Sequence, residues 1–213
     1  MRIYPNEYKK ASADYRENWA LLNEILYKMC KDYYFHKDLS TINAKVWIIG
    51  RTYATGIERM ISSSGAQGDS LGKLAKHLYK NRTTLDSIFN RLLSIKEPLS
   101  TAKLKFIVME HGKFVRLLAE ILRDNQSARS FASKYMHFHC PAVPIYDRYA
   151  NGELRRICPL EDSYELFDLP KGADEEYYYF AMRFWQLYKK FKESVGRTNA
   201  RLIDCYLLWM AEE

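Results

Sequence analysis

Apolar residues recur at helical spacing along almost the whole chain, whereas the alternation that is typical of strands is scarce. Trp19, Leu22, Ile25 and Met29 form the clearest stripe, which predicts a first amphipathic helix. The same periodicity predicts further helices over residues 41–60, 71–79, 84–93, 101–123, 174–195 and 201–210. We therefore predict an all-α fold, a helical domain of about eight to ten helices.

Residues that begin or end helices set several of these boundaries. Ser40 and Thr41 are suited to cap the helix that follows them, and Gly196 is suited to end the long helix before it. Residues 101–123 form one helix or a pair interrupted at Gly112, because glycine is a weak helix former. No repeat, low-complexity tract or long heptad run is present, so a coiled coil is not expected.

Length and composition fit one domain that spans residues 1–213, or two small lobes with a cleft between them. The chain has 213 residues, 47% of them hydrophobic, which is enough for a proper core. The best candidate for a membrane segment, residues 46–50, is far too short to cross a bilayer. The N-terminus lacks the features of a secretory signal. We therefore expect a cytoplasmic monomer with no membrane association.

The balance of charges favours a polyanionic partner. Lys and Arg total 33 against 26 Asp and Glu, so the formal net charge is +7, which is modest support for nucleic-acid binding. The 17 tyrosines could fill the core or stack on bases. The four cysteines are too widely spaced for a zinc ribbon or a cluster-binding loop, and we expect them to be reduced thiols.

The residues from Ser127 to Ala150 contain the strongest candidates for chemistry. Lys134 lies in an amphipathic helical segment, and Asp147 follows Pro144. Prolines interrupt the helix between them, so the lysine and the aspartate stand on separate elements and could face one cleft. Asp147 is also expected at the start of a new helix, where the helix dipole favours a carboxylate. This pairing suggests chemistry on DNA.

Three segments between residues 114 and 147 carry a resemblance to a known family. They are 114–122 (FVRLLAEIL), 131–136 (FASKYM) and 144–147 (PIYD). Their order resembles the core of the helix-hairpin-helix DNA glycosylases, in which a helix, a hairpin and a lysine-bearing helix precede an aspartate that follows a proline. The resemblance implies a helix-hairpin-helix-like unit. It also implies an enzyme that removes a damaged or modified base flipped out of double-stranded DNA, in repair or in defence against phage.

The resemblance implies roles for individual residues. Asp147 matches the family's essential aspartate, which would stabilise the oxocarbenium-like transition state at C1′. Lys134 matches the lysine that bifunctional members use as an amine nucleophile, which would add strand cleavage through a Schiff base. The flipped base enters a pocket. The candidates to line it, close by in sequence, are Tyr146, Tyr149, His137 and His139.

Two further groups of polar residues are candidates for the pocket and for DNA contact. Small and polar side chains interrupt an apolar helix over residues 50–59, which a packing role explains equally well. The pocket candidates there are Arg51, Thr52, Tyr53 and Glu58. The turn that corresponds to the family's glycine-rich hairpin has no glycine, so phosphate contacts would come from side chains. These DNA-binding candidates are Asn125, Ser127, Arg129, Ser130 and Arg148.

Simpler interpretations stand beside these. Aspartate is a favoured helix cap, so Asp147 could serve only to cap a helix. Lys134 could be a solvated lysine whose stem covers apolar surface. We expect no metal and no cofactor, because His137 and His139 would point about 200° apart on a helix. The alternative to a DNA glycosylase is a catalytically inert helical module that binds nucleic acid or a protein partner.

Overall fold

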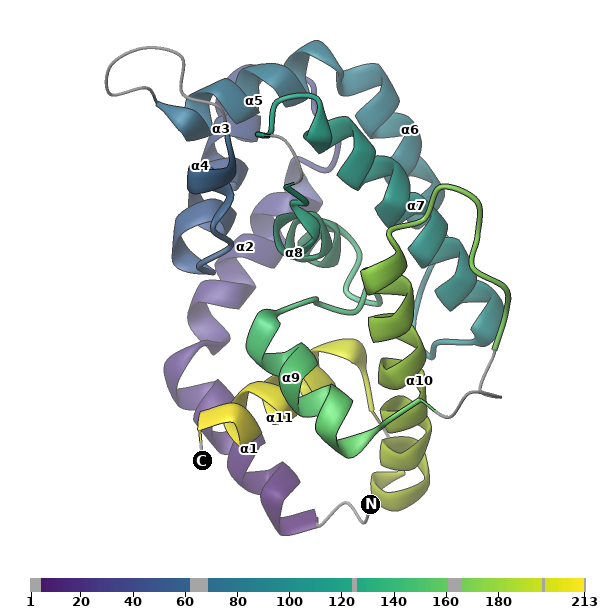
Figure 1. Ribbon diagram of the computed structural model, residues 1–213. Helices are drawn as coiled ribbons and strands as arrows, with labels where there is room; N and C mark the ends of the chain where they lie inside the picture. The colour runs from purple at the N-terminus through teal and green to yellow at the C-terminus, as the bar shows by residue number, and fades with distance from the viewer. Residues whose placement is uncertain (1–4, 62–68, 124–125, 161–165, 197, 213) are drawn as a thin grey trace.

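Helices make up the regular structure of the chain in the computed structural model, which describes residues 5–61, 69–123, 126–160, 166–196 and 198–212 (Figure 1). Within these ranges there are eleven α-helices and one π-helical segment, η1, but no β-strand. The helices are α1 (Pro5–Asn18), α2 (Ala20–Asp32), α3 (Leu39–Trp47), η1 (Ile48–Thr52), α4 (Ile57–Met60), α5 (Ser70–Lys80), α6 (Arg82–Leu92), α7 (Thr101–Ala119), α8 (Arg129–His139), α9 (Arg148–Ile157), α10 (Glu175–Val195) and α11 (Ala200–Glu212). The prediction of an all-α fold is confirmed.

The helix α8 lies in the middle of the molecule and is seen nearly along its axis in Figure 1. Helices α2 and α7 and the segment η1 pack against it, and every residue from Phe131 to His139 is buried. Polar side chains in such a helix must find partners inside the protein, because an unpaired buried polar group is costly. The positions of Lys134 and its polar neighbours are therefore fixed by interactions with other elements.

The helix predicted over residues 41–60 is broken, and its start is also different. Asp38 caps α3, since its Oδ1 accepts from the backbone N–H of Thr41 at 2.9 Å, so the expected cap at Ser40 and Thr41 is wrong by two to three positions. The chain then leaves the α-helical pattern at η1. Ala54 and Gly56 follow with φ angles of 47° and 71°, in the left-handed region that a helix cannot contain.

Gly112 does not interrupt a helix, because α7 continues through it. A Cβ atom at this position would lie 2.6 Å from the carbonyl oxygen of Gly172, so the glycine allows a close approach of the chain before α10. The end of α10 at Gly196 is confirmed, with the glycine in the left-handed conformation. All four cysteines are buried and unpaired. In the described part of the chain, none of the helices combines the length and apolar character needed to span a membrane.

Candidate active site

The segment that follows α8 is tied back onto that helix. The Oγ of Ser133 accepts from the backbone N–H of Tyr146 at 2.9 Å and donates to the carbonyl of Ser130 at 3.1 Å. The hydroxyl of Tyr177 on α10 donates to the carbonyl of Pro144 at 2.7 Å. These bonds hold the chain just before Asp147 against the turn of α8 that carries Lys134.

Lys134 and Asp147 form an ion pair, as the sequence suggested they could. The Nζ of Lys134 donates to Oδ2 of Asp147 at 2.8 Å and to the carbonyl oxygen of Tyr53 at 2.9 Å. Lys134 is only 5% exposed, whereas the Asp147 side chain is 19% exposed. The lysine amine is therefore largely shielded from water and held by two oxygens, and the carboxylate stands nearer to the surface.

Asp147 has a second interaction, because it is also the N-cap of α9. Its Oδ1 accepts from the backbone N–H of Tyr149 at 3.0 Å, and its backbone is extended, as is usual for this position. Both carboxylate oxygens are thus engaged, one by the helix and one by the lysine. The positive end of the helix dipole and the ammonium group both lie against this carboxylate. Capping and pairing coexist in one residue.

The carbonyl of Tyr53 reaches Lys134 because the helix ends there. The π-helical segment η1 stops at Thr52, and the left-handed Ala54 and Gly56 turn the chain before α4 begins. Carbonyl groups at a helix end have no partner within the helix and can accept from other groups. The break that the sequence periodicity missed therefore supplies one of the two oxygens that hold the lysine amine.

A pocket of about 200 Å³ opens beside the ion pair. It lies where the end of α1, the end of η1, the start of α9 and the helix α11 meet α8. Its aromatic lining comes from Tyr15, Trp19, Tyr53 and Trp209. The volume is below the roughly 300–1,000 Å³ of pockets that take drug-sized ligands. The pocket therefore suits a single small planar group, with flat rings available for stacking.

A second charged pair, which the sequence analysis did not identify, lines the same pocket. The Nη1 of Arg201 donates to Oδ2 of Asp204 at 2.8 Å, and the Arg201 guanidinium lies 5.1 Å from the centroid of the Tyr15 ring. Asp204 is 3% exposed. Among the described residues, neither its Oδ1 nor the Nε of Arg201 has a hydrogen-bond partner. Burial raises the pKa of the Asp204 carboxyl to about 6, against the opposing effects of Arg201 and Lys134.

Thr52 and Tyr53 line the pocket as predicted, but His137 and His139 do not. Both histidines are buried on other faces of α8. His137 donates from Nδ1 to the carbonyl of Val143 at 2.7 Å and accepts from the hydroxyl of Tyr27. His139 pairs with the buried amine of Lys45 at 2.9 Å and with the carbonyl of Tyr135 at 2.8 Å. Their expected role at the pocket is corrected to one in the packing of α8.

The other predicted pocket residues also lie outside its lining. Tyr146 is directed to Glu176, with its hydroxyl 3.3 Å from Oε1. Tyr149 is 71% exposed, next to the cap that begins α9. Arg51 and Glu58 pair with each other at 2.6 Å on the surface. Arg51 also covers the ring of Trp47. Of this stretch, the backbone carbonyl of Tyr53 reaches Lys134, whereas Arg51 and Glu58 bind each other.

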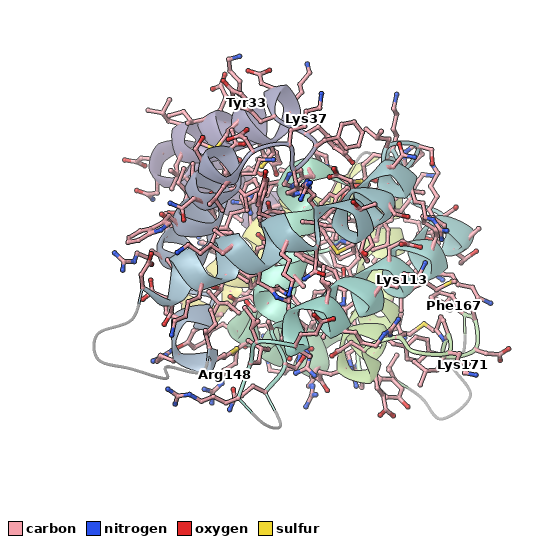
Figure 2. All side chains as sticks on the ribbon, turned by 90° about the horizontal axis from the view of Figure 1, so that it is seen from above. Tyr33, Lys37, Lys113, Arg148, Phe167 and Lys171 are labelled. Carbon is pink, nitrogen blue, oxygen red and sulfur yellow. The ribbon has the colours of Figure 1, made fainter. Side chains whose placement is uncertain are left out.

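The residues predicted to contact DNA are mostly engaged within the protein. Arg129 donates to both carboxylate oxygens of Asp174, at 2.9 and 3.1 Å, and Ser127 donates to the same carboxylate at 3.1 Å. The carbonyl of Ser130 accepts from Ser133, as described above. Arg148 is exposed and projects from the edge of the molecule (Figure 2). Asn125 lies outside the described residues.

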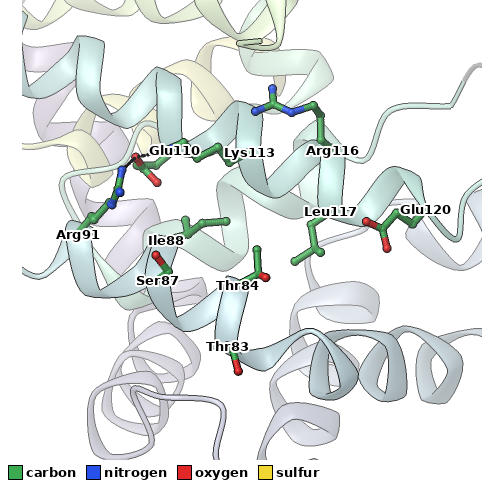
Figure 3. Close-up of a pocket in the computed structure, with 10 residues that line it drawn as sticks. All are labelled: Thr83, Thr84, Ser87, Ile88, Arg91, Glu110, Lys113, Arg116, Leu117 and Glu120. Carbon is green, nitrogen blue, oxygen red and sulfur yellow. Dashed lines mark hydrogen bonds and ion pairs between the residues drawn. The ribbon is translucent and has the colours of Figure 1, made fainter. Parts of the chain in front are cut away.

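A larger hollow lies far from this site, between α6 and α7, and has a volume of about 550 Å³. Figure 3 shows its lining, in which Arg91 is joined to Glu110. Glu110 is fully buried and also pairs with Lys113 at 2.6 Å. Arg91 and Lys113 therefore share one carboxylate oxygen of Glu110, and none of the predicted site residues lines this hollow. The smaller pocket beside Lys134 and Asp147 is the better candidate for chemistry.

Comparisons with protein-family models, with curated proteins and with solved structures found no match for this chain. The resemblance to the helix-hairpin-helix glycosylases therefore stays a hypothesis that rests on the residues themselves. Within the described ranges, no three or more Cys, His, Asp or Glu side chains are grouped so that they could hold a metal ion. The groups that line the pocket are the amine of Lys134, the guanidinium of Arg201, carboxyl groups and aromatic rings.

Proposed function

We propose that this protein is a DNA N-glycosylase that removes a modified base at the pocket beside Lys134 and Asp147. The observation that carries the proposal is the ion pair of a shielded lysine with a helix-capping aspartate, 2.8 Å apart at the edge of an aromatic pocket. An amine and a carboxylate in contact, next to a pocket for a flat group, are what this reaction requires from the protein.

Asp147 would act on the sugar. As the bond between C1′ and the base breaks, positive charge develops on the sugar ring, and a fixed carboxylate beside it lowers the barrier. Asp147 is held by the α9 cap and by Lys134, so it would need little reorganisation during the reaction. It can also accept a proton from an attacking nucleophile, since its oxygens are within hydrogen-bond distance of such a group.

Lys134 would be either a nucleophile or a fixed cation. For attack on C1′ its amine must lose a proton, and the carboxylate at 2.8 Å is a suitable acceptor. The covalent product would be a Schiff base, which leads to strand cleavage in addition to base release. If the amine keeps its proton, a water molecule attacks C1′ instead and Lys134 holds the carboxylate in place. Trapping with borohydride separates these two cases.

The base would leave the helix and enter the pocket between the rings. Tyr15, Trp19 and Trp209 offer flat surfaces for stacking, which supports almost any base. The excess of basic residues, with a formal net charge of +7, favours approach to the DNA backbone. Exposed Arg148, next to the aspartate, is a candidate for phosphate contact.

The second candidate function is an inert module that binds DNA or protein without chemistry. One observation favours it: Ser127 and Arg129, at the turn that should contact phosphate, are bound to Asp174 instead. A module of this kind would keep Lys134 and Asp147 only as a structural pair and cap. The two candidates differ in a single measurable property, the release of free base.

The test is incubation of the purified protein with DNA duplexes that carry oxidised, alkylated, deaminated or phage-type modified bases, with detection of free bases by mass spectrometry. Asp147→Asn is the matched variant, because asparagine keeps the cap and removes the charge. We expect a base that the wild-type protein releases and the variant does not. Salt-sensitive DNA binding without any base release would contradict a glycosylase and support the inert module.

A further inference from the structure

The Arg201–Asp204 pair lines the pocket, and no interaction within the described structure accounts for both residues. Its partners are three positions apart on α11 and bind each other, yet one carboxylate oxygen and one guanidinium nitrogen have no hydrogen-bond partner among the described residues. Both atoms are buried, and the two residues line the pocket. Buried polar atoms are rarely left without a partner, so this pair indicates a role in function in addition to packing.

Two of the carboxyl groups that line the pocket, those of Asp147 and Asp204, are held in different ways. Both oxygens of Asp147 accept hydrogen bonds, one from the amine of Lys134 and one from the backbone N–H of Tyr149. Asp204 is buried, and its Oδ1 is free to hold a proton while Oδ2 accepts from Arg201. A hydrogen-bonded carboxylate beside a buried carboxyl with one unpartnered oxygen is the arrangement of a fixed anion and an acid in one active site.

We propose that Asp204 is the general acid of this pocket, which gives its carboxyl proton to the departing base while Arg201 positions the carboxyl. The inference rests on the proposed glycosylase function and names a further catalytic residue for it. It also defines the substrate class as bases that are uncharged in DNA. Such bases would leave as anions and so need a proton, in contrast to cationic alkylated bases.

Protons and electrons balance in the release of the base. As the bond from C1′ to the base breaks, its electron pair goes to the base nitrogen, which takes the proton from Asp204. The resulting carboxylate is stabilised by Arg201. Water forms the new bond to C1′ and loses a proton to Asp147. Solvent at the pocket mouth later removes the proton from Asp147 and restores the one on Asp204, so both residues return to their starting states.

The surroundings of Asp204 determine how its protonation depends on pH. The titratable groups that interact with it electrostatically are Arg201, Lys134, Asp147, Tyr27, Tyr53 and Cys205. Burial raises the pKa of both tyrosines and of the cysteine, so these three stay neutral near pH 7. Asp14 and Glu212 line the same pocket. Burial outweighs the two cations, Arg201 and Lys134, which leaves the Asp204 pKa at about 6. A useful fraction of the carboxyl is then protonated close to neutral pH.

The test compares base release at single turnover by the wild-type protein, by Asp204→Asn and by the control Glu153→Gln, from about pH 5 to pH 8. Glu153 pairs with Arg156 on the surface of α9, outside the pocket, so its variant should match the wild type. The probes are duplexes with 8-oxoguanine, uracil or 5-hydroxymethylcytosine, and one with cationic 7-methylguanine, which leaves as a neutral base without a proton.

On neutral bases, we expect the wild-type rate to fall by up to about tenfold per pH unit above about pH 6. Asp204→Asn should lower the rate by about 10²–10⁴-fold and remove this decrease of the rate with pH. On 7-methylguanine, the variant should lose much less. An equal loss on both kinds of base, or an unchanged pH limb, would overturn the role of Asp204 while leaving a glycosylase intact. No base release by the wild type from any duplex would overturn the glycosylase proposal, and this inference with it.

A second measurement on the wild-type protein covers the case in which Asp204→Asn does not fold. Carbon-13 NMR of the aspartate carboxyl groups follows their titration directly, and a buried acid should titrate above the ordinary aspartate value of about 3.9. A pocket aspartate that titrates near pH 6 supports the proposal. Titration of all aspartates at or below the ordinary value would contradict it, whatever the activity of the protein.

Discussion

Replacement of Asp147 by alanine and by asparagine separates its two interactions. Alanine removes both the cap of α9 and the ion pair, whereas asparagine keeps an oxygen that can cap the helix and accept from Lys134. Loss of a cap destabilises a protein by about 0.5–2 kcal/mol. Loss of a fully buried ion-pair partner costs about 3–5 kcal/mol. Here the aspartate side chain is 19% exposed and Lys134 keeps its bond to Tyr53, so we expect less than that full value.

These contributions predict that Asp147→Ala lowers the free energy of unfolding by about 2–4 kcal/mol, and Asp147→Asn by about 1 kcal/mol. In a chain of this length, 1 kcal/mol shifts the Tm by about 2–4 °C, so the alanine variant should melt about 5–15 °C below the wild type. Urea unfolding followed by circular dichroism measures the free energy of unfolding of both variants. Equal stability of the two variants would refute the assignment of Asp147 as a cap that the structure shows, because alanine cannot replace it.

Three further predictions concern the amine, the buried histidines and the glycine of α7. Lys134→Met should abolish the protein–DNA adduct that borohydride traps, and an adduct of wild-type intensity would show that another group attacks the sugar. Burial lowers the pKa of His137 to about 3 and of His111 to about 4, so their neutral forms stabilise the fold above about pH 6.5, and this is lost as the pH falls toward those values. The raised pKa of Asp204 has the opposite effect on stability between about pH 4 and 6, but this effect is smaller than that of the two histidines. The urea midpoint should therefore decrease as the pH falls from about 7.5 to 4.5. A midpoint that rises over this range would contradict the burial of the histidines. Gly112→Ala should destabilise the protein by about 1–3 kcal/mol in thermal unfolding, because its Cβ would lie 2.6 Å from a backbone carbonyl oxygen, and an unchanged Tm would be inconsistent with that contact.

Helices with strong local signals could be predicted from the sequence. The long stripe of α10, with Gly196 after it, is encoded within the helix itself. Helix α2 was also predicted, but Trp19 and Ile25 of its stripe are exposed, and its buried residues are Asn23, Leu26 and Cys30. The break after η1 could not be predicted, since the apolar residues on both sides keep a helical spacing while the chain turns through Gly56. Helix α1 was missed because its sequence is polar, and it is held by packing against α11, which lies at the other end of the chain.

The candidate site was predicted only where its residues lie close together in the sequence. Lys134 and Asp147 are thirteen positions apart, and the prolines between them indicate a return of the chain. The pocket walls come from both ends of the chain, so no local pattern relates Trp19 to Trp209. One signal was present for Asp204: it and Arg201 are charged residues within an otherwise apolar helix, where charges occur almost only in pairs.

The yield of free base from modified duplex DNA, compared between the wild-type protein and Asp147→Asn, tests the central claim most directly. Both proteins keep the α9 cap, so they should bind DNA with similar affinity, and a difference in release then reports on chemistry. The account predicts release of one kind of base by the wild type and its loss in the variant. Equal release by the two proteins, or none by the wild type on any duplex that it binds, would contradict the assignment of this ion pair as a catalytic centre.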